Sequence, residues 1–143
     1  MQQTGSYIDL AQDSQRDGML YTPDMSRRAR GIDLWAVLHH LGQKGVANLV
    51  ETLHQHAVYL AGELKDSPIT VLNEVVFNQV MLQCESPELT QTLLAKIQAS
   101  GVIWCGGAQW QGQPVIRISI CSWKTTQVDM DITLKTILNC LKS

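Results

Sequence analysis

The sequence lacks most of the features that mark specialised classes of protein. Only 17% of its 143 residues are charged and the formal net charge is -2, so its composition excludes a basic nucleic-acid binder. No apolar run approaches the roughly 18 residues that cross a bilayer. The N-terminus lacks the basic start and apolar segment of a signal peptide. We therefore expect a soluble, cytoplasmic protein with neither a nucleic acid nor a membrane as its partner.

Metal and nucleophile motifs are also missing. The sequence contains four cysteines, at positions 84, 105, 121 and 140. No pair has the C-x-x-C spacing, which argues against a zinc ribbon or a thioredoxin motif and favours reduced thiols packed as small hydrophobes. His39 adjoins His40, and His54 lies two residues before His56, so neither pair shares a helix face as metal ligands would. We expect both pairs on solvated helix faces and predict no metal site. No G-x-S-x-G elbow, phosphate-binding glycine loop or paired acid site is present.

The first part of the chain is predicted to be an arm followed by two helices. Residues 1–27 show no sustained periodicity and are interpreted as an arm or loop. Apolar residues at helical spacing predict a helix over 28–41, which Gly42 stops. The same spacing, continued for about five turns, predicts a second helix over 45–65 that ends before Pro68. We take residues 28–66 as linking helices.

The pattern then changes to short β-branched segments, and residues 67–143 are predicted to form an α+β domain. Ser86 and Pro87 are typical of a helix start, and Gly101 closes that helix. Thr126 and Asp129 resemble a capping box that opens a last helix. Strands are predicted over 69–72, 75–82, 102–105 and 115–121, with 106–114 as a hairpin of loop character. The expected fold is α+β: a small antiparallel sheet of about four strands covered by helices.

A cluster of arginines and one separate arginine are candidates for binding a carboxylate or a phosphate. Arg27, Arg28 and Arg30 form the densest polar cluster, and a guanidinium is a good fork for carboxylate or phosphate. The alternative is that they pair with acidic residues of a neighbouring surface. Arg117 interrupts an apolar strand between two isoleucines and is expected on the side opposite both. Carboxylate binding and simple solvent exposure remain equally open for Arg117.

Several segments, taken in order, resemble one family: the group II pyridoxal-phosphate-dependent amino-acid decarboxylases, which act on glutamate, aromatic amino acids or 2,4-diaminobutyrate. An "RR" step leads into a helix that carries Trp35, and an "lGxxG" link follows at 41–45. The other similar segments are 72–80, 101–104, 110–112, 116–121 and 123–129. The resemblance extends from about Tyr7 to the end of the chain.

The resemblance implies the C-terminal part of a much longer, fold type I enzyme. The Schiff-base lysine of that family lies upstream, in a His-Lys dipeptide. Here the first lysine is Lys44, and no histidine directly precedes a lysine. The resemblance therefore implies pyridoxal phosphate in the intact family but no cofactor on this chain alone, and no decarboxylation by it. The expected partners are the missing large domain or a complementing chain, with a homo-oligomer.

The resemblance also suggests roles for individual residues. Residues 9–21 would correspond to the mobile loop that closes over the active site of the partner subunit, and Tyr21 is the nearest candidate for its catalytic tyrosine. Arg117 falls where a small-domain arginine faces the substrate carboxylate. Lys44 and Lys124 are expected to be solvent-exposed. The competing hypothesis is a free-standing α+β binding module, although an arm ending in an arginine cluster favours a severed enzyme.

Overall fold

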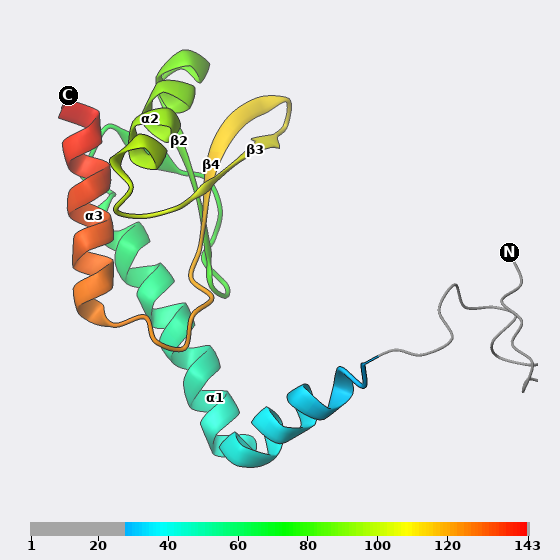
Figure 1. Ribbon diagram of the computed structural model, residues 1–143. Helices are drawn as coiled ribbons and strands as arrows, with labels where there is room; N and C mark the ends of the chain where they lie inside the picture. Colours follow the sequence, from blue (N-terminus) through cyan, green and yellow to red (C-terminus); the bar gives the residue numbers. More distant parts are fainter. Residues whose placement is uncertain (1–27, 143) are drawn as a thin grey trace, which may run out of the picture. The chain divides into compact units, whose positions relative to one another are not determined.

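The computed structural model describes residues 28–142 of the chain (Figure 1). Its elements, in order, are α1 (Gly31–Glu63), β1 (Ile69–Val71), β2 (Gln79–Cys84), α2 (Pro87–Ser100), β3 (Gly106–Trp110), β4 (Gln113–Ser119) and α3 (Gln127–Lys142). The chain divides into two compact units, and the division falls between Leu41 and Gly42, inside α1.

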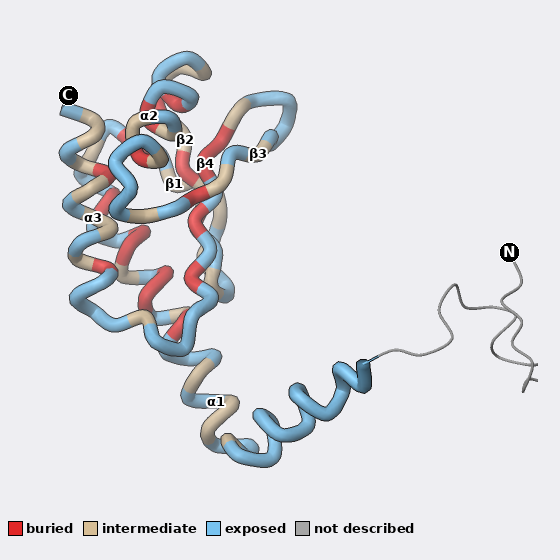
Figure 2. Tube along the Cα trace, viewed as in Figure 1, coloured by how far each residue is buried: buried red, intermediate tan, exposed pale blue. Residues whose placement is uncertain are grey.

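Gly42 interrupts α1. Its backbone has φ 61° and ψ -179°, a combination that is essentially restricted to glycine. The helix predicted to end at Leu41 therefore ends there, and the second helix resumes directly after the break. Every residue from 28 to 40 is exposed, as the uniform pale blue of this part of α1 in Figure 2 shows. The first half of α1 (residues 31–41) thus differs from its second half (43–63), where five residues are buried.

The second unit contains a four-stranded antiparallel sheet in the order β1-β2-β4-β3. Val80 of β2 lies opposite Ile118 of β4, and Ile116 of β4 lies opposite both Leu82 and Gly107. The second half of α1, together with α2 and α3, lies on one side of this sheet (Figure 1). The expected α+β class, with a small antiparallel sheet covered by helices, is confirmed.

The core lies between this sheet and the three helices. Leu60, Leu64, Val80, Ile97 and Ile137 have no exposed surface. Burying an aliphatic side chain of this size stabilises a fold by about 1.5–3 kcal/mol, so these contacts account for much of the unit's cohesion. Because Leu60 belongs to α1 and Leu64 directly follows its last residue, the second half of that helix is part of the folded unit.

The predicted caps of α2 and α3 are present. The Ser86 hydroxyl accepts a hydrogen bond from the Leu89 amide at 3.2 Å, and Gly101 closes α2 with φ 66°. At the start of α3, the Thr126 amide and hydroxyl donate to the Asp129 carboxylate at 2.8 and 2.7 Å. These bonds satisfy groups that a helix end otherwise leaves unpaired.

Two strand predictions were wrong in position. Residues 75–78 and 102–105 are not strands, and β3 occupies 106–110, which was interpreted as loop. Gln111 and Gly112 both have positive φ, 51° and 77°, and form a tight hairpin turn between β3 and β4. The pairing of these two strands therefore extends to Trp110 and Gln113, on either side of the turn. Gly107 belongs to this ladder, and a Cβ there would sit 2.8 Å from Cδ2 of Leu94 on α2. A larger residue at this position would require the Leu94 side chain to shift, so the glycine reflects close packing against α2.

The side chain of Asn73 holds the connection between β1 and β2 together through hydrogen bonds. The Asn73 amide donates to the Gln79 carbonyl at 3.1 Å, and its oxygen accepts from the Met81 amide at 2.8 Å. This pairing replaces the strand that was predicted to begin at 75. Residues 72–78 consequently form a longer connection than the two-residue turn that Asn73 and Glu74 suggested.

Candidate functional site

The predicted arginine cluster lies only partly within the described residues. Tyr21 and Arg27 fall outside them, and the structure gives no information on either. Arg28 and Arg30 are exposed. Arg28 forms an ion pair with Asp33 in the first turn of α1, with Nη2 and Oδ2 2.7 Å apart. Both partners are largely solvated, so this pair contributes little stability. Asp33 belongs to the same segment and not to a neighbouring surface, so both interpretations of the arginine cluster stay predictions.

Arg117 is exposed on β4 between the buried Ile116 and Ile118. Because side chains alternate along a strand, Arg117 points to the sheet face opposite the two isoleucines and therefore away from the helices. It lies opposite Met81 on β2 and Gly106 on β3. The guanidinium is thus available on the face of the sheet that no helix of the second unit covers.

This uncovered sheet face is mostly polar. By alternation and register, residues of β1, β2 and β4 that share the face of Arg117 are Thr70, Gln79, Met81, Gln83, Gln113, Val115 and Ser119. Val115 is buried, and the other six retain exposed surface. A polar face with one cation suits a hydrated contact with another polypeptide or an anion better than a dry hydrophobic interface.

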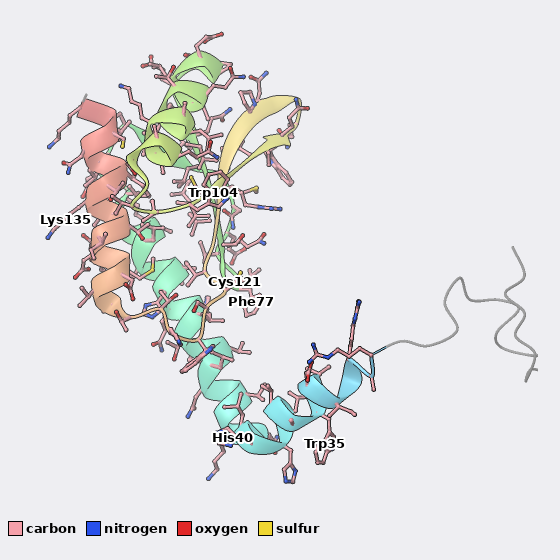
Figure 3. The ribbon with its side chains drawn as sticks, viewed as in Figure 1. Trp35, His40, Phe77, Trp104, Cys121 and Lys135 are labelled. Atoms are coloured by element: carbon pink, nitrogen blue, oxygen red, sulfur yellow. The ribbon has the colours of Figure 1, made fainter. Side chains whose placement is uncertain are left out.

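No lysine occupies a site suited to Schiff-base chemistry. Lys44, Lys65, Lys124, Lys135 and Lys142 are exposed; Figure 3 shows Lys135 projecting from α3. Lys124 lies over the ring of Trp123, with 5.2 Å from Nζ to the ring centroid.

Lys96 is partly buried and lines a cavity of about 190 Å³, together with Glu85, Leu89 and Cys140. That volume is below the roughly 300 Å³ at which ligand pockets begin. The lysines within residues 28–142 therefore lie on open surface or beside this small cavity, and none of them offers an enclosed site that fits pyridoxal phosphate.

A larger cavity, of about 340 Å³, lies between the end of β4 and the start of α3. Its lining includes Trp104, Cys105, Cys121, Asp129 and Met130. The Asp129 carboxylate is engaged by Thr126, whose hydrogen bonds lower the pKa of Asp129. Burial raises the pKa of the Cys105 thiol, which keeps it protonated and a poor nucleophile. Neither Asp129 nor Cys105 is therefore poised as a catalytic base or nucleophile.

A polar contact joins α1 to α3. The Tyr59 hydroxyl donates to the Asp131 carboxylate at 2.7 Å, which lowers the pKa of Asp131 and raises the pKa of Tyr59. Nearby, a ring nitrogen of His56 lies 3.2 Å from the Thr125 carbonyl oxygen.

The expectation that His54 and His56 lie on a solvated face was wrong, because His56 is buried and His54 is partly buried against the Val75 carbonyl. Both histidines have structural contacts to backbone.

Metal sites and membrane-spanning helices are the two remaining classes of feature within residues 28–142. In this part of the chain, no group of three or more His, Cys, Asp or Glu side chains is placed to hold a metal ion. Among the helices described, none combines the length and the hydropathy that crossing a bilayer requires.

The fold itself is one found in pyridoxal-phosphate decarboxylases. No protein-family model matches the sequence. Solved structures do match, at sequence identities that establish a common fold alone. In each case this chain corresponds to one segment of a much longer polypeptide.

Three of these structures illustrate the match. Oryza sativa TDC with PLP and tryptamine is 16% identical with a TM-score of 0.77, over 84% of this chain and 28% of that one. Catharanthus roseus tryptophan decarboxylase in complex with L-tryptophan is 16% identical with a TM-score of 0.77, over 89% of this chain and 29% of that one. The glutamate decarboxylase domain of a Vibrio parahaemolyticus diaminobutyrate-pyruvate transaminase and L-2,4-diaminobutyrate decarboxylase is 16% identical, with a TM-score of 0.64, over 76% and 25%. This chain thus spans less than a third of these chains.

Proposed function

We propose that this chain is the C-terminal small-domain segment of a group II pyridoxal-phosphate-dependent amino-acid decarboxylase. The observation that carries the proposal is the coverage: most of this chain, but only 25–29% of three such structures, shares one fold. The ordered sequence similarity from Tyr7 onward supports the same assignment. The substrate is an amino acid of a kind that the segment itself does not select.

The segment requires the large domain for chemistry. Pyridoxal phosphate supplies an electron sink for decarboxylation, and it needs a lysine for attachment and a carboxylate at its ring nitrogen. The exposed lysines described above do not provide such a site. On this proposal, the large domain supplies both groups, in the cytoplasm and within a homo-oligomer, and this chain alone neither binds the cofactor specifically nor decarboxylates an amino acid.

Within that assembly, the open sheet face is the candidate contribution to the site. Arg117 is exposed there without a burial cost, and a guanidinium is matched to a carboxylate in charge and geometry. We assign Arg117 to the substrate carboxylate, while Arg28 and Arg30 remain candidates for an interface or an anion. Tyr21 stays a candidate for the catalytic tyrosine of the loop.

Borohydride trapping tests the proposal directly. The purified chain is mixed with pyridoxal phosphate, its absorbance is followed for an aldimine band, and the mixture is reduced and mapped by peptide mass. The expected result is only weak labelling distributed over several exposed lysines. Stoichiometric labelling of a single lysine would overturn the proposal and would make that lysine the centre of an independent activity. The competing free-standing module predicts no complex with a decarboxylase large domain.

A further inference from the structure

The first half of α1 exposes apolar side chains in almost every direction. Ile32, Leu34, Trp35, Val37 and Leu38 are between 47% and 64% exposed. At about 100° per residue these positions spread around the helix, and Asp33 and His40 occupy the narrow polar side that remains. Figure 3 shows Trp35 standing out from this helix. His39 stacks on Trp35, with 5.1 Å between the ring centroids.

A helix with this pattern is unsuited to free solution. A surface helix of a globular protein carries a single apolar stripe, whereas a helix that is apolar all round is buried. Helices shorter than about 12–15 residues are also marginal in water without packing. The segment 31–41 therefore needs protein around several of its sides.

A concave partner fits this requirement better than a second copy of the same helix. Two symmetric helices cover only one stripe of each other and would leave the opposite side of each helix in water. The related structures contain a much larger body, since this chain covers only 25–29% of three of them. We propose that residues 31–41 are the docking element of this chain and insert into an apolar groove of the pyridoxal-phosphate-binding large domain. This inference rests on the proposed function.

Docking leaves the second unit unchanged. No residue from 31 to 41 belongs to the core of that unit. Gly42 interrupts the helix with a backbone conformation that other residues avoid, so the two halves of α1 are separate helical segments. Substitutions in the first half therefore alter the docking surface without removing a core contact.

The test is co-expression of the full chain with a group II decarboxylase large domain from the same organism, recognised by its His-Lys dipeptide. The chain carries an affinity tag, and the Kd of the complex is measured for three forms: wild type, Trp35→Asp and Trp123→Asp. Trp123 is the matched control, because it is 75% exposed but lies in the second unit. Thermal unfolding of each variant alone checks that the second unit stays folded.

The expected result is a complex whose Kd rises at least tenfold with Trp35→Asp and less than twofold with Trp123→Asp. Hydrogen exchange at residues 31–41 should slow in the complex. A Trp35→Asp complex within twofold of wild type, or equal losses from both variants, overturns the docking inference while leaving the proposed function intact. If the wild-type chain binds no large domain, the proposed function itself fails. If sedimentation then shows a dimer that only Trp35→Asp disrupts, the partner is a second copy and the inference is wrong.

Discussion

Leu60→Ala tests whether the second half of α1 is a structural part of the folded unit. Leu60 has no exposed surface and packs in the core beside residues of the sheet and α3. Removing a buried leucine side chain costs about 2–5 kcal/mol, because transfer energy is lost and a cavity remains. A unit of this size is stable by about 5–15 kcal/mol in total, so the loss is a large fraction. With a urea m-value of about 1–1.5 kcal/mol/M, a loss of about 3 kcal/mol lowers the midpoint by about 2–3 M.

The matched control is Leu38→Ala, the same substitution in the first half of the same helix. Leu38 is 47% exposed and lies outside the core, so its change should stay within about 0.5 kcal/mol. Far-UV circular dichroism during urea unfolding measures both variants. Equal midpoints for Leu60→Ala and Leu38→Ala would refute the reasoning, because they would show that residues 43–63 form a linker and not part of the folded unit.

Three further outcomes test individual contacts. The Tyr59 hydrogen bond lowers the pKa of Asp131, so its stabilisation is complete above the usual Asp value of about 3.9 and is lost as pH falls through the lowered pKa. It is lost again as pH rises through the raised pKa of Tyr59. In unfolding titrations, Tyr59→Phe should remove the alkaline dependence and weaken the acid one, because Gln127 and Lys135 also lower the pKa of Asp131. Gly107→Ala should destabilise by about 1 kcal/mol because its Cβ meets Leu94, and adding Leu94→Ala should produce a non-additive cost in a double-mutant cycle. Ser86→Ala should lower the unfolding free energy by about 0.5–2 kcal/mol through loss of the α2 cap; an unchanged melting temperature would contradict that role.

Helix ends were predictable because their signals are local. Ser86 and Pro87 supply a cap and a preset φ within two residues, and Gly42 supplies the conformation that breaks α1. Strand positions were less predictable because a ladder depends on its partner. β3 is polar and contains two glycines, and it forms because it pairs with β4. The turn at Gln111 and Gly112, where both residues have positive φ, brings the two strands together. The apolar residues at 102–105 predict a strand there, but this segment lies outside the sheet.

Tertiary contacts explain the errors among candidate site residues. The sequence around His56 is compatible with a solvated helix face, and only the approach of the loop before α3 buries the ring against the Thr125 carbonyl. The orientation of Arg117 was predictable, because two flanking isoleucines fix the alternation of the strand. The contact that Arg117 makes was not predictable, because its ligand or partner would approach a sheet face that the described residues leave open.

The two halves of α1 differ in how their apolar residues are distributed around the helix. Both halves carry apolar residues at helical spacing, so periodicity predicts a helix in each. In the second half, the buried residues Leu53, Ala57, Leu60 and Ala61 keep to one side, which is the side that the sheet covers. In the first half, the apolar positions spread around the helix and are exposed among residues 28–142. If residues 31–41 dock as proposed, the number of apolar directions, rather than the period, distinguishes a helix that packs within its own domain from one that packs against another.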